Sequence, residues 1–241
     1  MRKQFVLQVL ILFVISTATS QVKLPVLHDS LFSTYYHQRV SFFQAMPVTK
    51  GEIIFLGNSI TDGAEWAQLF NDLRMKNQGI SGDVTAGLLH RLDVVTDRKP
   101  AKIFLLIGTN DLARGISADT VLHNIYLLAD YVKQQSPKTK LYVQSILPVN
   151  DGYGKFAGHT KNNEIIKQLN GQLQANAASH QYVYIDLHSL FVRQDGKLEG
   201  YFTNDGLHLM GSGYRLWKNI LYPYLYNRRA KLPKEQRIFR N

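Results

Sequence analysis

The chain has 241 residues, of which 45% are hydrophobic and 19% charged, and this balance excludes a disordered or fibrous protein. It contains no cysteine, which excludes disulfide bonds and a thiol nucleophile. The formal net charge is +10, but much of it lies near the two ends, at Arg2, Lys3 and in residues 227–241. Because basic and aromatic residues are not interleaved in repeats, we do not expect a nucleic-acid partner.

The first twenty residues resemble a secretory signal peptide. Arg2 and Lys3 precede an apolar run at residues 5–15, and small residues follow at 18–20. The run is shorter than the roughly 20 residues of a membrane-spanning helix, although an uncleaved anchor is the alternative. We therefore predict a signal peptide at 1–20, one domain at 21–229 and a basic tail at 230–241, in a protein exported to the periplasm or secreted. The tail is either solvated or in weak contact with an anionic surface, and the oligomeric state stays open.

Alternating strand and helix patterns follow the N-terminal segment. Short apolar runs predict strands at residues 52–56, 76–80, 102–107, 140–147 and 182–187. Apolar residues at helical spacing predict helices at 85–97, 118–135, 162–179 and 213–226, and a further one at 31–46 laid across the sheet. This order predicts an α/β protein: a flavodoxin-like, three-layer α/β/α sandwich around a five-stranded parallel sheet.

Polar motifs come directly after the predicted strands. The first strand runs into Asn58 and Ser59, the second into "NQGISG" at residues 77–82, and the third into "GTND" at 108–111. Between the last strand and the last helix lies "NDGLHL" at 204–209. Because open parallel sheets bind ligands beyond the carboxyl ends of their strands, we expect these motifs to converge there.

The converging residues suit acyl transfer. A serine hydroxyl such as Ser59 becomes a nucleophile when a histidine takes its proton, and a carboxylate must orient that histidine. Asp205 and His208 are three residues apart, so the carboxylate can reach the near ring nitrogen. The N–H groups of Gly79 and Ser59 and the side-chain amide of Asn110 would bind the oxyanion.

Taken one at a time, these motifs also have structural explanations. Ser59 followed by Asp62 fits a helix N-cap, and Gly79 and Gly82 fit a tight turn. Asp186, at the end of the fifth predicted strand, is an alternative acid for the histidine. The order of the four motifs together favours the catalytic interpretation.

The set "GNSITDG", "NQGISG", "GTND" and "DGLHL" resembles the SGNH, or GDSL-like, hydrolase family of esterases and lipases, from about residue 51 to 222. The resemblance implies Ser59 as nucleophile, His208 as general base, Asp205 as its acid, and Gly79 and Asn110 as oxyanion donors. Asn58 replaces the aspartate of the family's name pattern, at a position without a catalytic role. The longer motifs are similar to the branch of the platelet-activating-factor acetylhydrolase catalytic subunits and bacterial exported carbohydrate acetylesterases.

These features predict a serine esterase without metal or cofactor. The other seven histidines lack metal-ligand spacing, and we expect them at the surface or in structural hydrogen bonds. The family and the predicted export favour a short acyl group, most often acetyl, on a small-molecule or glycan ester. A lysophospholipase or thioesterase is the alternative among enzymes, and a catalytically silent glycan-binding module is the alternative from another class.

Overall fold

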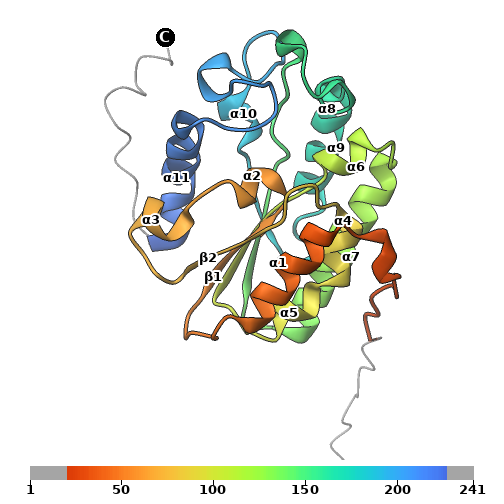
Figure 1. The fold of residues 1–241 in the computed structure, drawn as a ribbon, viewed down its shortest axis with the longest axis vertical. Coiled ribbons are helices and arrows are strands. Elements are labelled where there is room, and N and C mark those ends of the chain that lie inside the picture. Colours follow the sequence, from red (N-terminus) through yellow and green to blue (C-terminus); the bar gives the residue numbers. More distant parts are fainter. Residues whose placement is uncertain (1–20, 227–241) are drawn as a thin grey trace, which may run out of the picture.

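The computed structural model describes residues 21–226. The predicted signal peptide at 1–20 and the predicted basic tail at 230–241 lie outside the described residues. Between them the chain forms a sheet with helices on both sides (Figure 1).

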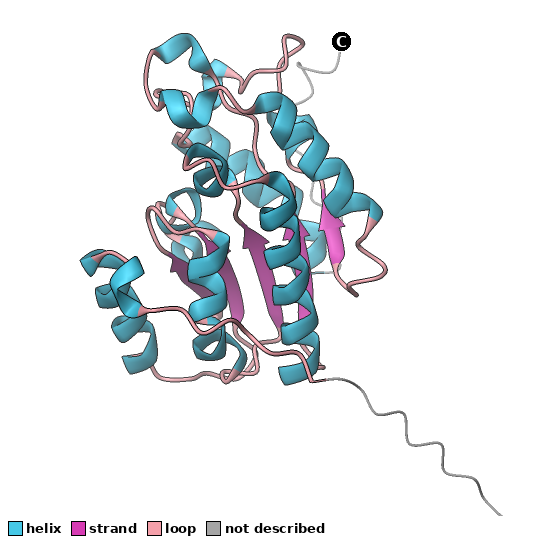
Figure 2. Ribbon diagram, turned by 90° about the vertical axis from the view of Figure 1, so that its right-hand side faces the viewer, coloured by secondary structure: helices cyan, strands magenta, loops and turns pink. Residues whose placement is uncertain are grey.

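The sheet has five strands, all parallel, in the order β2-β1-β3-β4-β5. Figure 2 shows the strands with helices around them. The strands are β1 (Ile53–Gly57), β2 (Met75–Gly79), β3 (Lys102–Leu106), β4 (Lys140–Gln144) and β5 (Val183–Ile185). The predicted parallel α/β sheet is therefore confirmed, with the flavodoxin-like strand order. This order reverses between β1 and β3, which pair side by side.

The helices divide between the two faces of the sheet. The longer ones are α1 (Thr34–Ala45), α7 (Ala118–Gln135), α9 (Asn163–Ala175) and α11 (Gly211–Tyr226). The shorter ones are α2 (Ser59–Asp62), α3 (Trp66–Phe70), α4 (Thr85–His90), α5 (Leu92–Thr96), α6 (Thr109–Ala113), α8 (Ala157–Thr160) and α10 (His188–Phe191), with 3-10 turns at Asp29–Leu31, Asp151–Tyr153 and Gly200–Phe202. Helices α3 and α11 contact each other on one face, while α4, α5, α7 and α9 form a connected layer on the other (Figure 1).

A row of aromatic rings crosses the sheet and anchors α3 and α11. Phe55, Phe104 and Tyr142 are register partners on adjacent strands, and their rings stack at 5.3 and 4.6 Å between centroids. Trp66 of α3 stacks on Phe55 at 3.9 Å, and Trp217 of α11 meets Trp66 edge-on at 4.9 Å. Burial of such large rings supplies much of the hydrophobic stabilisation of this layer.

The predicted strand at 140–147 is three residues too long. β4 ends at Gln144, and the N–H of Ser145 makes a last backbone hydrogen bond to the Ile185 carbonyl of β5 before the buried chain leaves the sheet. Ser145 Oγ accepts the N–H groups of Leu187 and His188, and the Asn170 carboxamide bonds both the N–H and the C=O of Ile146. Side chains thus replace strand partners, and an apolar run alone does not reveal this exchange.

The predicted helix at 85–97 is broken at Arg91, which ends α4 and precedes α5 with φ −115° and ψ 16°. The Arg91 side chain is only 1% exposed and lies within the fold. It forms a salt bridge of 3.0 Å with Asp83 and donates to the carbonyl of Gln78. The break lets a charged side chain reach inward between two apolar turns.

Helix α1 packs differently from the prediction. Its buried residues Tyr36 and Phe43 form a small cluster with Ile80, separate from the main core, and it contacts α5. The helix therefore lies over the segment that follows β2 rather than across the sheet. Among residues 21–226, none of the helices has the length and apolar character needed to cross a membrane.

Arg98 ties the end of α1 to the start of β1. Its guanidinium donates to both carboxylate oxygens of Glu52 at 2.7 Å, and to the carbonyls of Met46 and Pro47. The Glu52 side chain is fully buried. Burial acts to raise the pKa of Glu52, but hydrogen bonds from Arg98 and Thr49 outweigh it and hold that pKa below its usual value.

We predict that Arg98→Leu lowers the free energy of unfolding by about 3–5 kcal/mol, because Glu52 would remain buried without its partner. Urea unfolding measures the loss. Arg193→Leu is the control, because Arg193 and Asp195 form an exposed pair whose removal should cost less than about 1 kcal/mol. Equal losses in both variants would contradict this interpretation.

Candidate active site

Ser59 lies at the turn between β1 and α2, at the carboxyl end of the sheet. It is the first residue of α2, and Asn58 caps that helix by accepting the N–H of Ile60 on its side-chain oxygen at 3.1 Å. Tyr214 of α11 donates its hydroxyl to the carbonyl of Ile60 at 2.9 Å. The cap explains why asparagine suits position 58, and both contacts hold the backbone next to Ser59.

His208 reaches Ser59 from the far end of the chain. The Ser59 Oγ and the His208 Nε2 are 3.0 Å apart, although 149 residues separate them in the sequence. The His208 Nδ1 lies 2.8 Å from the Asp205 Oδ2. The structure thus brings Ser59, His208 and Asp205 into one chain of hydrogen bonds.

Asp205 is held ionised by its surroundings. Burial alone would raise the pKa of this carboxyl, but hydrogen bonds from the Leu207 N–H and from His208 lower it below its usual value. Because an ionised carboxylate only accepts, the His208 Nδ1 carries the proton that it donates. In the neutral ring this leaves the Nε2 lone pair facing the Ser59 hydroxyl.

Asp186 has a different role from the one considered in the alternative triad. Its Oδ1 accepts the N–H of Ser189 at 3.1 Å, at the start of α10. No hydrogen bond between Asp186 and His208 occurs among the described residues. By contrast, the Asp205 carboxylate contacts both the backbone N–H and the ring Nδ1 of His208. Asp205 is the acid that the structure pairs with His208.

Asn110 is brought beside this group by β3. Thr109–Ala113 forms α6 immediately after Gly108, and residue Asn110 is 7% exposed. Its Nδ2 donates to the carbonyl of Asp83 at 2.8 Å, and its Oδ1 lies 2.9 Å from the His159 Nε2. An amide nitrogen has two hydrogens, so one N–H of Asn110 stays available for a ligand.

Gly79 does not fit the predicted role of oxyanion donor. Its N–H donates to the Asn77 Oδ1 at 2.9 Å. A Cβ added at Gly79 would overlap the backbone of Asp62, so glycine is required here for the close approach of β2 to α2. The prediction is wrong because a glycine at a strand end serves packing as readily as it serves anion binding.

Gly82, three residues later, has the features that Gly79 lacks. It is exposed and has φ +81°, a backbone conformation that favours glycine. Among the described residues its N–H has no hydrogen-bond partner, while its carbonyl accepts from Arg114 Nη2 at 2.6 Å. Ser81 donates from its N–H and its hydroxyl to Asp62, which holds the loop against α2.

His159 is a site residue that sequence reasoning missed. We expected a structural hydrogen bond for His159, and it makes one, but its partner is Asn110, a predicted oxyanion donor. Burial, His208 and Arg114 lower the pKa of His159, which favours the neutral ring. The residue lies 49 positions from Asn110, so no local motif could have linked the two. The part of the chain that the structure describes contains no cluster of three or more His, Cys, Asp or Glu side chains able to hold a metal.

Comparison with known proteins shows the family of the chain. Residues 55–216 match the GDSL-like Lipase/Acylhydrolase family. The chain belongs to this family. It is therefore an acylhydrolase by family, and the match spans Ser59, Asn110, Asp205 and His208.

Individual relatives agree with this assignment. The chain is 27% identical over 169 residues to the platelet-activating factor acetylhydrolase IB subunit alpha1 of Homo sapiens, covering 68% of this chain and 70% of that one. A solved structure from Streptococcus pneumonia, named as a platelet activating factor, is 30% identical with a TM-score of 0.73, covering 80% of this chain and 93% of that one. A GDSL-like lipase structure from Bacteroides thetaiotaomicron shares the fold, with a TM-score of 0.67 and 24% identity over 78% of this chain and 96% of its own.

We predict that Asp205→Asn lowers kcat for p-nitrophenyl acetate by a factor on the order of 10³–10⁴, because the amide cannot fix the His208 tautomer. Asp186→Asn is the matched control, and it should leave kcat nearly unchanged because Asp186 bonds Ser189. A large loss in Asp186→Asn with little loss in Asp205→Asn would reverse the assignment.

Proposed function

We propose that this acylhydrolase is a serine esterase that removes a short acyl group, acetyl, from a carbohydrate ester. The observation that carries the proposal is the hydrogen-bonded series from Ser59 through His208 to Asp205, with contacts of 3.0 and 2.8 Å. A serine, a histidine with a free lone pair and an orienting carboxylate are the groups that acyl transfer needs.

The reaction would run through an acyl-enzyme. Ser59 Oγ attacks the ester carbonyl as His208 Nε2 takes its proton, and the tetrahedral intermediate then collapses. The His208 imidazolium returns the proton to the departing alcohol. Water, deprotonated by His208, then attacks the acyl-Ser59 carbonyl, and the acid leaves as Ser59 regains its hydrogen.

Three donors from separate segments would bind the oxyanion. The Ser59 N–H lies at the start of α2, and Asn110 has an N–H beyond the one given to Asp83. The Gly82 N–H takes the place that we predicted for Gly79, whose N–H is bound to Asn77. Donors fixed before the reaction stabilise the developing charge without reorganisation.

The substrate class is inferred from the surroundings of the site and from the relatives. The human relative is named an acetylhydrolase, which supports a short acyl group. The exposed Phe156 ring meets His208 edge-on at 5.2 Å and offers an apolar face to the alcohol part of the ester, while polar Arg114 and His159 lie nearby. A sugar presents both an apolar ring face and hydroxyl groups, and it suits this mixture. We also propose export through the signal peptide predicted at residues 1–20.

A lipid acylhydrolase is the second candidate, because the family that the chain belongs to includes lipases by its description. A glycan-binding module without catalysis is the candidate from another class. It would gain nothing from a serine, histidine and aspartate kept in hydrogen-bond contact, which argues against it.

We predict that Ser59→Ala abolishes hydrolysis of p-nitrophenyl acetate, with kcat at least about 10³-fold lower, because alanine leaves no hydroxyl opposite the His208 Nε2. Residues 21–241 of wild type and variant should be assayed side by side. Ser189→Ala, which alters a serine at the start of α10, is the control and should retain activity. Activity retained in Ser59→Ala would contradict the proposed mechanism.

We predict that kcat/KM falls as the acyl chain lengthens from acetyl to decanoyl in p-nitrophenyl esters. Acetylated oligosaccharides should then be deacetylated in an assay of released acetate. A rise in kcat/KM with chain length would instead favour the lipid acylhydrolase.

A further inference from the structure

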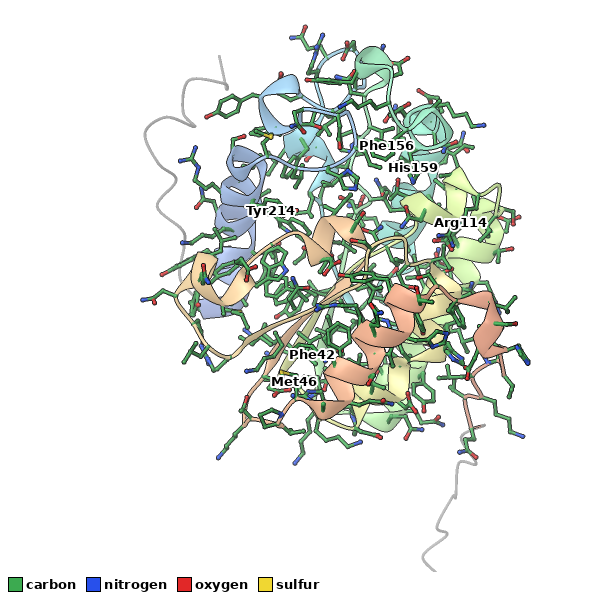
Figure 3. All side chains as sticks on the ribbon, viewed as in Figure 1. Phe42, Met46, Arg114, Phe156, His159 and Tyr214 are labelled. Carbon is green, nitrogen blue, oxygen red and sulfur yellow. The ribbon has the colours of Figure 1, made fainter. Side chains whose placement is uncertain are left out.

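Two rings, one in α8 and one directly before it, lie beside the catalytic histidine. His159 and Phe156, the residue before α8, lie together near Arg114 of the α6 region (Figure 3). The Phe156 ring is edge-on to His208 at 5.2 Å and to His159 at 5.8 Å. Phe156 adopts φ +53°, a backbone conformation uncommon for a bulky residue.

The contacts of the Asn110 carboxamide fix which way it faces. Its Nδ2 is 2.8 Å from the Asp83 carbonyl, which can only accept, so the amide nitrogen must be on that side. Its Oδ1 therefore faces the His159 Nε2 at 2.9 Å. Since the amide oxygen only accepts, the His159 Nε2 must carry a hydrogen. Rotating the amide by half a turn would set two acceptors, the Asn110 oxygen and the Asp83 carbonyl, against each other.

We propose that His159 is a positioning residue, which holds Asn110 so that its remaining N–H points at the oxyanion. The inference rests on the proposed esterase mechanism and adds a residue to it. His159 uses Nε2 for this contact, so that nitrogen is not a second general base. The neutral ring favoured by burial and by the nearby His208 and Arg114 places its single hydrogen on Nε2.

The α6 region also contacts the loop that follows β2, at Gly82 and Asp83. Arg114 donates to the Gly82 carbonyl at 2.6 Å, and Asn110 donates to the carbonyl of the next residue, Asp83. His159 thus supports Asn110, which contacts the loop at Asp83 and, in the proposed mechanism, donates to the oxyanion. Loss of His159 should loosen the Asn110 side chain and leave the Arg114 contact in place.

The kinetic test uses His159→Leu, which removes the donor, and His159→Gln, whose amide can still donate. We expect His159→Leu to lower kcat for p-nitrophenyl acetate by about 10-fold to 100-fold, less than the roughly 10²–10³-fold loss on removing an oxyanion donor outright. KM should change far less, and His159→Gln should recover most of the activity.

A double-variant cycle tests whether His159 acts through Asn110. With Asn110→Ala already present, adding His159→Leu should lower kcat only slightly further, because the group it positions is gone. An equal loss in both backgrounds would overturn the proposal, as would unchanged kcat in His159→Leu. Ser59→Ala separates the two claims: if it keeps the activity, the proposed mechanism fails irrespective of His159.

NMR tests the contact between His159 and Asn110 without measuring catalysis, and it also shows whether each variant is folded. In ¹⁵N-edited NMR spectra the Asn110 side-chain NH₂ should be rigid in the wild type and in His159→Gln, and mobile in His159→Leu. Backbone spectra report whether each variant is folded. Equal rigidity of the Asn110 amide in folded His159→Leu would overturn the inference.

Discussion

The pairing of β1 with β3 is the constraint on which the rest of the site depends. Parallel strands end at the same edge, so the residues that follow β1 and β3 emerge beside each other where the strand order reverses. Ser59 and Asn110 occupy those two positions. The other residues are carried to this edge by their own loops, His208 from 149 residues beyond Ser59. The sheet edge therefore positions Ser59 and Asn110, and the loops supply His208 with Asp205 and the N–H of Gly82.

Polar contacts, together with the packing of Ile80 against α1, hold the loop after β2 in place. The loop after β2 is bonded to Asp62 through Ser81, to Arg91 through Asp83, and to α6 through Arg114 and Asn110. A buried polar group left without a partner costs about 1–3 kcal/mol, so these contacts stabilise the loop. A network of this kind limits movement of the donors before a substrate arrives, which is the condition for electrostatic stabilisation of a transition state.

Sequence reasoning recovered the features that have a local pattern. Apolar runs revealed the strands, and the spacing of Asp205 and His208 revealed how they could meet. It failed where the outcome depends on a contact between distant segments. The sequence alone does not tell which of Gly79 and Gly82 has a free N–H for an anion. The contacts of Gly79 with Asn77 and Asp62 show that Gly79 does not. The break at Arg91 depends on a partner in another segment, and the link between His159 and Asn110 spans two helices.

Covalent labelling tests the central claim, that Ser59 is the activated nucleophile, most directly. A fluorophosphonate loses fluoride as a serine oxygen bonds to phosphorus, so the mass of the intact protein and of its peptides reports the site. We predict one adduct per chain, located on Ser59 and absent from Ser59→Ala, with much slower labelling in His208→Ala. An adduct at another residue, or no adduct at all, would contradict the account.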